Sequence, residues 1–546
     1  MILPRVKVLQ ESNHRFCQDL IFPKTPDGDK ARKLMNLLSP AFPAAVGPQP
    51  NVFLQDAKFQ HIGEYRLCVT PAQITIAYAQ YEGLRNAIAT LSALVAPDGL
   101  KCGEISDFPD NAFRSCLLDL ARGYVEIPQL KEHLVRLGKL KFNFVHFHLM
   151  DRQSYIIDSE VVPNPDHQRR YTKAELKDLV TFCNLLGLEI IPEIEFPAHA
   201  VYLVSALPEL ACDIIDMEKA CKAVEAVENP KKENYIDRKK RVSSWTVCVG
   251  KDSTYEIYDR ILDEIAEIFP GQYIHIGGDE IAFPHLAAFP NWDNCRACKK
   301  LIDTYNTDRT AVYHHGIRRI HDLVKSKGKK TIKWNLLDEC AHDIDLPSDI
   351  IYEHWVSDYA DCAQADMARW ISLGHTTINA QYHYTYADLH NYMTAEKIKT
   401  WTPSFSQTPL PGMWGGEMCA WELGNPDYSY YAYTLPVCMA LFSDRVWNSN
   451  VAQYDERYVT AVFGTVIGNH TLNFSPLGLL EDIIPPRSQD LLAELNRDSL
   501  CPEAILSTAE RLKNVAEDAC YGKFALRNFI QYLIDLHRAL TEQKAE

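Results

Sequence analysis

The sequence predicts a (β/α)8 barrel, the TIM barrel, preceded by a small α+β domain and followed by a helical carboxy-terminal region. From about residue 112 onward, short apolar strand patterns alternate with amphipathic helix patterns, and eight strand patterns occur within one stretch of about 330 residues. The glycine-rich turn that follows the first strand of a dinucleotide-binding open sheet is missing here. The pattern therefore favours a closed barrel over an open sheet.

The chain divides into three regions by pattern. Before the barrel, strand patterns at 65–69 and 74–78 precede a helix pattern at 81–94, which indicates a small mixed domain. After the barrel, the pattern is mostly helical, with a long amphipathic stretch at 502–540. The expected regions are the small domain at 1–108, the barrel at 109–448 and the helical region at 449–546.

The elements of the barrel can be assigned in order. A helix at 128–140 has a proline in its first turn, where a missing amide N–H is tolerated. A helix at 172–186 begins with the capping box of Thr172 and Glu175 and ends at Gly187. Two further helices are expected at 253–268 and 307–325, and the eight strands at 115–120, 142–149, 188–194, 273–276, 331–334, 350–355, 376–380 and 416–421.

Charge and hydropathy exclude several classes of protein. The 546 residues include 72 acidic and 56 basic side chains, a formal charge of -16 that repels nucleic acid and anionic lipid. The first residues alternate apolar and charged side chains and lack the apolar core of a signal peptide, and no uncharged apolar run is long enough to span a membrane. We therefore expect a cytoplasmic protein without a nucleic-acid or membrane partner; the oligomeric state does not follow from the sequence.

The sixteen cysteines are expected to be free thiols in a reducing compartment, because they are scattered singly and several lie inside apolar runs. Cys295 and Cys298 form one CxxC pair, but a zinc site needs two further ligands, which the sequence does not place. We therefore expect no metal site and no cofactor.

Polar and aromatic residues follow the expected strands at their carboxyl ends, where the active site of such a barrel forms. They are Asp119, Arg122, His146, His148, Asp151, Glu193, Glu195, His199, Asp279, Glu280, Trp334, Trp355, Tyr386, Asp388, Trp421 and Glu422. Tryptophan faces stack on sugar rings, and carboxylates and arginine pair with hydroxyl groups, whereas a phosphorylated substrate would require more positive charge than one arginine. The set indicates a sugar site.

Asp279 and Glu280 follow Gly277-Gly278 at the end of the fourth expected strand. Cleavage of a glycosidic bond needs a general acid and a group that stabilises an oxocarbenium-like transition state. Neighbouring residues on a strand point to opposite faces, so this pair is not expected to flank one bond as the usual two carboxylates do.

Five motifs occur in order at expected strand ends. They span 113–124, 145–154, 191–200, 275–281 and 415–421, and the fourth reads His-Ile-Gly-Gly-Asp-Glu-Ile. Together they resemble glycoside hydrolase family 20, the β-N-acetylhexosaminidases, and residues 1–108 are similar to the non-catalytic α/β domain of that family. The resemblance implies an exo-acting hydrolase that removes terminal β-linked N-acetylglucosamine or N-acetylgalactosamine from a glycan. Catalysis would retain configuration, because the substrate's own acetamido oxygen attacks the anomeric carbon and forms an oxazolinium ion.

The resemblance also implies roles for single residues. Glu280 would be the acid and then the base, Asp279 would orient the acetamido N–H, and Tyr386 would hydrogen-bond the acetamido oxygen. Asp151 and His199 would form a charge chain to Glu280. The walls of the sugar pocket would be Trp334, Trp355 and Trp421, and the partners of the ring hydroxyls would be Arg122, Asp388 and Glu422. Glu422 directly follows Trp421, where the family commonly has one residue between, and such a shift would turn the carboxylate away from the sugar.

Other interpretations of the same residues stay open. Arg122 can be a structural ion-pair partner of Asp119. His146 and His148, with Asp279 across the barrel, can hold a divalent ion, which would make the chain a metal-dependent hydrolase. A sugar-binding protein without activity is a third alternative, which the intact carboxylate pair opposes. The sequence does not decide between a gluco and a galacto sugar, nor which linkage or 6-substituent is accepted.

Overall fold

The structure, a computed structural model, describes most of the chain up to residue 449. The described residues are 2–216, 218–219, 244–281, 290–336, 339, 343–357, 362–387, 393, 395–406, 410–424 and 431–449, with scattered residues between 462 and 541. Asp388 and most of the helical region expected at 449–546 lie outside them. Among the described helices, none is both long and apolar enough to cross a membrane.

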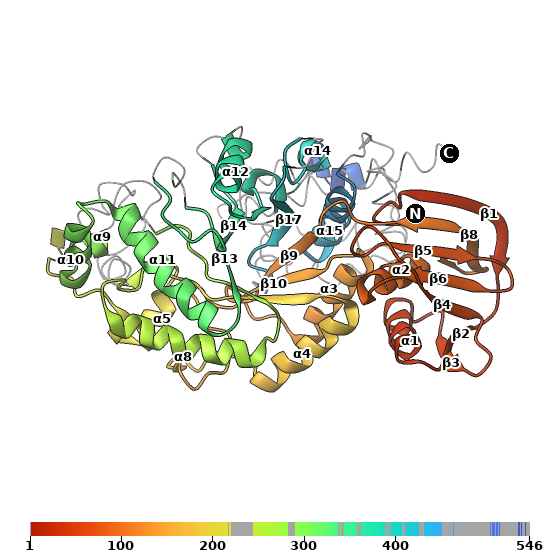
Figure 1. The fold of residues 1–546 in the computed structure, drawn as a ribbon, viewed down its shortest axis with the longest axis horizontal. Helices are drawn as coiled ribbons and strands as arrows, with labels where there is room; N and C mark the ends of the chain where they lie inside the picture. Colours follow the sequence, from red (N-terminus) through yellow and green to blue (C-terminus); the bar gives the residue numbers. More distant parts are fainter. Residues whose placement is uncertain are drawn as a thin grey trace.

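The small amino-terminal domain is a mixed sheet with two helices, and it lies beside the barrel (Figure 1). Its sheet has the order β1-β8-β5-β6-β4, β7 pairs with β8, and β2 pairs with β3 in a separate ladder. The elements are β1 (Val8–Phe16), β2 (Leu20–Pro23), α1 (Pro26–Leu38), β3 (Ala44–Gly47), β4 (Val52–Asp56), β5 (Tyr65–Val69), β6 (Ile74–Tyr78), α2 (Tyr81–Ala93), β7 (Val95–Ala96) and β8 (Gly99–Asp107). The sequence patterns predicted β5, β6 and α2 but missed β1, because most of its side chains are exposed and show no apolar alternation.

The second domain is a closed ring of eight parallel strands, which confirms the predicted barrel. The strands are β9 (Phe113–Asp119), β10 (Phe144–His148), β11 (Glu189–Glu193), β12 (Tyr273–His275), β13 (Lys330–Trp334), β14 (Ile351–His354), β15 (Thr377–Asn379) and β17 (Met413–Ala420). The ring closes because β17 pairs with both β15 and β9. A two-residue strand, β16 (Tyr386–Ala387), adds to β17 at the carboxyl end of the ring.

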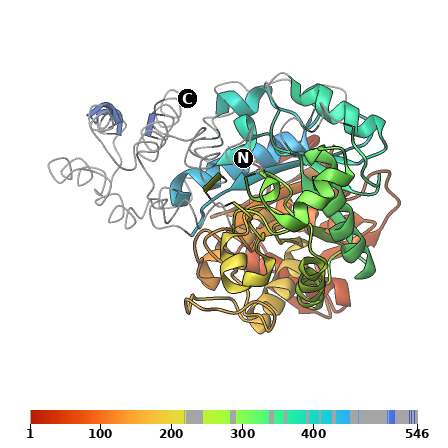
Figure 2. The same cartoon turned by 90° about the vertical axis from the view of Figure 1, so that its left-hand side faces the viewer.

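The helices of the barrel surround the strands, as the yellow to cyan segments show (Figure 2). The longer ones are α3 (Ile127–Lys139), α4 (Lys173–Leu186), α8 (Asp252–Ile268), α11 (Arg309–Ser326), α12 (Ala363–Ser372) and α15 (Tyr431–Trp447); the shorter ones are α5 (Val201–Ala206), η1 (Pro208–Leu210), α9 (Pro290–Asp293), α10 (Arg296–Thr304), α13 (Tyr382–Thr385) and α14 (Ala395–Thr400). The capping box of α4 is confirmed: the Thr172 hydroxyl accepts from the Glu175 amide at 3.1 Å, and the Glu175 carboxylate accepts from the Thr172 amide at 2.8 Å. Gly187 ends this helix with a left-handed φ of 69°.

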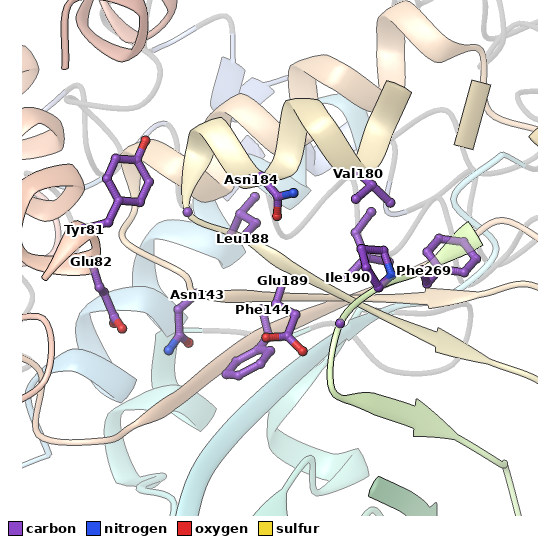
Figure 3. A pocket seen from close by; sticks show the side chains of 13 residues that line it. Tyr81, Glu82, Asn143, Phe144, Val180, Asn184, Leu188, Glu189, Ile190 and Phe269 are labelled. Carbon is purple, nitrogen blue, oxygen red and sulfur yellow. The ribbon is translucent and has the colours of Figure 1, made fainter. Parts of the chain in front are cut away.

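Several ion pairs join the small domain to the barrel, and two of them lie at the start of β9 and before β10. Glu82 of α2 accepts from Arg114 of β9 at 2.6 Å, and Asp107 at the end of β8 accepts from the buried Lys141 at 2.8 Å. Beside this junction lies a cavity of about 410 Å³, lined by side chains of α2, α4 and the first residues of β10 and β11 (Figure 3). It opens at the amino-terminal strand ends, so the residues predicted at the carboxyl ends are not part of it.

The described cysteines are free, as expected, but four of them that are scattered along the sequence lie close together in the structure. Cys212 and Cys248 lie beside Cys295 and Cys298, so the CxxC pair has the two neighbouring thiols that the sequence did not place. Their proximity depends on how two long loops pack together, which no local spacing encodes.

Candidate active site

The carboxyl ends of the barrel strands surround a cavity of about 610 Å³. Most of the residues expected from the sequence line it: Arg122, Asp151, His199, Asp279, Glu280, Trp355, Tyr386, Trp421 and Glu422. They come from loops that follow different strands, as expected for a barrel active site. The topology therefore brings into one cavity residues that are separated by up to three hundred positions in the sequence.

Asp279 and Glu280 reach the cavity because the chain turns sharply after β12. Gly277 has a φ of 66°, and an ideal Cβ placed on it would lie 1.8 Å from a carboxylate oxygen of Glu195, so only glycine fits there. Glu280 also takes a left-handed conformation, with a φ of 41°. Such backbone costs about 1 to 3 kcal/mol in a residue with a side chain and is typical of functional sites. Because the strand has already ended at His275, the alternation expected of a strand does not separate the two carboxylates.

His199 connects the two carboxylates to a chain of charges. Its Nε2 lies 3.3 Å from Oε2 of Glu280 and 3.7 Å from Oδ2 of Asp279, and its Nδ1 lies 3.2 Å from Oδ2 of Asp151. Asp151 in turn accepts from Arg122 at 2.7 Å. Burial alone would lower the pKa of His199, but the carboxylates of Asp151 and Asp279 raise it well above its usual value. His199 is therefore an imidazolium at neutral pH.

The pKa of the Asp279 carboxyl lies close to neutral pH. Burial, together with the nearby Glu280 and Glu193, raises the pKa of Asp279 to about 6, although the His199 imidazolium opposes the shift. Its Oδ1 is buried and has no hydrogen-bond partner among the residues that the structure describes. Asp279 thus offers an acceptor, ionised above about pH 6, beside the cavity.

Arg122 is both an ion-pair partner and a cavity residue. It contacts Asp119 at 3.0 Å, as the structural alternative predicted, and also Asp151 at 2.7 Å and Glu422 at 3.7 Å, and its guanidinium carbon lies 4.6 Å from the ring centre of Trp421. The expectation that the position of Glu422 turns its carboxylate away is wrong. Glu422 follows the end of β17 with a φ of 56°, and this left-handed turn directs the carboxylate to Arg122 while the Glu422 amide donates to Asp119 at 2.9 Å.

Aromatic side chains form one wall of the cavity. Trp355, Trp421 and Tyr386 line it, and the ring centres of Tyr386 and Trp421 are 5.8 Å apart. Trp334 is not in this wall. Its side chain is almost fully buried beneath Trp421, with ring centres 6.3 Å apart, because its Nε1 donates to Glu193 inside the barrel at 2.7 Å. The predicted Asp388 lies outside the described residues.

Comparison with family models decides the family. The model for the catalytic domain of glycosyl hydrolase family 20 matches residues 111–434, and the model for domain 2 of this family matches residues 17–108. The chain belongs to glycosyl hydrolase family 20. All five resembling motifs, and every predicted site residue, lie within the first match.

Curated relatives of this family 20 chain are β-hexosaminidases. The one from Akkermansia muciniphila is 30% identical over 256 residues, which cover 43% of this chain and 48% of the relative. The one from Vibrio furnissii is 26% identical over 380 residues, which cover 64% and 56%. The chain thus spans about half the length of these relatives. A crystal structure of an exo-β-N-acetylglucosaminidase from Vibrio harveyi, in complex with N-acetylglucosamine, has a TM-score of 0.69 at 21% identity and covers 88% of this chain and 77% of that one, which shows the same fold.

Several residues of the family 20 site were missed by sequence reasoning. Trp245 lines the cavity and its Nε1 donates to the Glu280 carbonyl at 2.8 Å, but it stands in a stretch without a clear pattern. Tyr382 also lines the cavity, four residues before Tyr386, at the spacing of one helical turn. His148 was expected at a strand end only as a possible metal ligand, and it instead contacts Asp151 at 3.1 Å.

The constellation expected for a metal-dependent hydrolase is not found among the described residues. Both ring nitrogens of His148 contact carboxylates, Nδ1 that of Glu193 and Nε2 that of Asp151. Asp279 is close to Glu195 and His199 instead of facing the two histidines of β10. The position of Asp279 therefore favours a role beside Glu280 over a role as the third ligand of such an ion.

Proposed function

We propose that the chain hydrolyses terminal β-linked N-acetylhexosamine and that the acetamido group of the substrate is the nucleophile. The observation that supports this most strongly is that Asp279 and Glu280 occupy one cavity and flank the same nitrogen of His199. A retaining glycosidase with its own nucleophile places two carboxylates about 5 Å apart on opposite sides of the bond. Consecutive carboxylates that share one imidazole instead match an acid and a partner for the acetamido N–H.

Asp279 would be the partner of the acetamido group. Its buried Oδ1 makes no hydrogen bond with the described residues, and the pKa of about 6 leaves it ionised at neutral pH. A carboxylate in that state accepts the amide N–H and stabilises the positive charge that develops as the oxazolinium ion forms. Tyr386, across the same cavity, would donate its hydroxyl to the acetamido oxygen and align it with the anomeric carbon.

Glu280 would transfer the protons. In the first step the acetamido oxygen bonds to the anomeric carbon, the bond to the leaving oxygen breaks, and Glu280 gives its proton to that oxygen. In the second step Glu280 takes a proton from water, whose oxygen attacks the same carbon and opens the oxazolinium ring. Each step inverts the anomeric carbon, so the two steps together retain its configuration. The His199 imidazolium, 3.3 Å from Oε2 of Glu280, stabilises the carboxylate between these steps.

The rest of the cavity supports a sugar as ligand. Trp355 and Trp421 offer faces for the pyranose ring, and Arg122 and Glu422 offer polar groups for its hydroxyls. The related structure from Vibrio harveyi holds N-acetylglucosamine, which supports N-acetylglucosamine as the first sugar to test. The cytoplasmic location expected from the sequence stays a prediction.

The test is hydrolysis of chromogenic aryl glycosides by the full chain. We expect turnover of the N-acetyl-β-glucosaminide or N-acetyl-β-galactosaminide and none of the β-glucoside, which lacks the acetamido group. Glu280→Gln should abolish turnover and leave the thermal unfolding midpoint unchanged, whereas Glu256→Gln, an exposed position on α8, should have no effect. Equal rates on the glucoside would exclude substrate assistance, and sugar binding without any turnover would favour the silent sugar-binding protein. A panel with 6-sulfated glycosides would define the specificity.

A further inference from the structure

Four cysteine thiols converge beside the active-site loops, although they come from three separate segments. Cys212 follows η1, Cys248 precedes α8, and Cys295 and Cys298 stand at the start of α10. All four side chains are buried. The Cys248 sulfur lies 3.6 Å from those of Cys295 and Cys298, and the Cys212 sulfur lies 3.9 Å from that of Cys298. All four sulfur atoms lie within 4.8 Å of one another.

The sulfur separations fit a tetrahedral metal site. A disulfide holds its sulfur atoms about 2.05 Å apart, so these four cysteines are free thiols. A zinc ion about 2.3 Å from four thiolates at the corners of a tetrahedron sets neighbouring sulfurs about 3.8 Å apart. The separations of 3.6 Å and 3.9 Å lie on either side of this distance. We propose that Cys212, Cys248, Cys295 and Cys298 bind one structural zinc ion.

The four cysteine ligands indicate that the ion has a structural role. Four sulfur donors fill a tetrahedron and leave no position for water or substrate, which is the arrangement of structural zinc sites. The pair Cys295-Arg-Ala-Cys298 has the two-residue spacing that such sites use. Tetrahedral four-sulfur sites hold zinc or iron, and zinc is the ion for a site that only has to join segments of the chain.

The proposed site joins the loop after β11 to the loop after β12. Short backbone hydrogen bonds already link these loops next to the cysteines: the Ile215 amide donates to the Asn294 carbonyl at 2.6 Å, and the Arg296 amide donates to the Asp213 carbonyl at 3.2 Å. An ideal Cβ on Gly250 would lie 2.5 Å from the Ala297 carbonyl carbon, so the backbones are in close contact. A zinc ion would add metal–sulfur bonds to a junction that these backbone contacts, and side-chain hydrogen bonds such as that from Trp292 Nε1 to the Val247 carbonyl at 3.4 Å, already hold.

The junction also supports the loop of the proposed catalytic acid. Trp245 stands three residues before Cys248, and its indole Nε1 donates to the Glu280 carbonyl at 2.8 Å. Glu280 sits in a left-handed conformation that its surroundings have to maintain. The four cysteines do not line the cavity, so they would act on catalysis only by positioning this loop.

The direct test is the metal content of the full chain, purified without chelators or metal-affinity resin. Elemental analysis should find about one zinc ion per chain, released when a mercurial reagent blocks the thiols. After metal removal, added Co²⁺ should give the visible absorption of tetrahedral cobalt bound to thiolates. One iron ion per chain would overturn the assignment to zinc. Absence of both metals together with no cobalt spectrum would overturn the site.

Variants locate the ion. Cys298→Ser removes a ligand that contacts two of the other three thiols, and it should lower the zinc content from about one ion to almost none and lower the unfolding midpoint. Cys183→Ser, a buried free thiol in α4, should keep one zinc ion per chain. If Cys298→Ser does not fold, the zinc content and cobalt spectrum of the unmodified chain still decide. Zinc retained by a folded Cys298→Ser variant would contradict the proposed ligands. Metal content is measured without a glycoside, so its outcome is independent of the proposed hydrolysis.

Discussion

The barrel interior has two buried layers of opposite character, one above the other. Near the amino-terminal strand ends the inward side chains are apolar: Phe113, Phe144, Ile191, Ile332, Ile351 and Ile378. Two positions further along β10, β11 and β14, the inward side chains are His146, Glu193 and Glu353, and His275 and Glu417 join them from β12 and β17. Both layers are closed to solvent, so exposure does not explain the difference. The apolar layer packs the interior of the ring of strands. The ionic layer supports the residues of the active-site cavity at the carboxyl ends of the strands, which we call the mouth of the barrel.

The charged residues of the ionic layer tolerate burial because they are paired. Glu193 contacts His146 at 3.3 Å and His275 at 3.0 Å, and it also hydrogen-bonds to His148. Burial alone would raise the pKa of Glu193, but these histidines hold it well below its usual value. In the same way, burial alone would lower the pKa of His146, yet Glu417 and Glu193 raise it to about 9. Each charge therefore depends on its neighbours, and removal of one weakens the pairing of the buried charges that contact it.

The largest expected effect is therefore the removal of Glu193. Glu193→Ala should lower the free energy of unfolding by about 3 to 5 kcal/mol, because His146 and His148 each lose one of the two carboxylates that they contact in a buried site. The Nε1 of Trp334 also loses its acceptor. Urea unfolding followed by tryptophan fluorescence would measure this loss. The exposed Glu256→Gln is the control, expected within about 0.5 kcal/mol of the unmodified chain. A loss below about 1 kcal/mol for Glu193→Ala would show that the ionic layer does not depend on this carboxylate.

Asp279→Asn should separate function from stability at the mouth. We expect kcat on acetamido substrates to fall by about 10² to 10³-fold, the usual effect of removing one transition-state hydrogen bond. Stability at neutral pH should not fall. The pKa of Asp279 is raised by folding, so its ionised form opposes folding as pH rises from about 4 through 6, and removal of that charge is neutral or favourable.

Unfolding and initial-rate measurements on the same preparation of Asp279→Asn would check both expectations. A variant that loses both stability and activity would contradict the division between the ionic layer and the mouth.

The next effect concerns the pH dependence of activity, which we expect His199 to set through Asp279. The acid limb of kcat/KM in the unmodified chain should lie near pH 6, where Asp279 loses its proton, because only the carboxylate accepts the acetamido N–H. His199→Gln removes the cation that lowers the pKa of Asp279, whereas burial and the nearby Glu280 still raise this pKa. The acid limb should move to higher pH by about one unit or more. Rates on an aryl glycoside across the acidic and neutral range would show it, and an unmoved limb would mean that another group sets it.

The sequence predicts the parts of the structure that depend on local pattern. The eight strands and α4 follow from short apolar runs and end signals, and the ring then brings the strand ends together without further information. Three features depend on contacts between distant segments and could not be predicted. Cys212 and Cys248 meet the CxxC pair only when two loops pack. Glu422 faces the cavity only because its backbone is left-handed, and Trp334 lies below the wall because Glu193 holds its indole.

The smallest expected effect tests the apolar layer. Ile332→Val removes one methylene group from a fully buried side chain of β13, two residues before Trp334. The free energy of unfolding should fall by about 0.5 to 1.5 kcal/mol, the ordinary cost of a small cavity. The kcat/KM and the acid limb should not change, because no charge near Asp279 is altered and the ionic layer separates this position from the mouth. Urea unfolding and a pH profile on one preparation would measure both. A shifted acid limb in Ile332→Val would mean that packing at the amino-terminal ends sets the geometry of the mouth, and the two layers would then act as one unit.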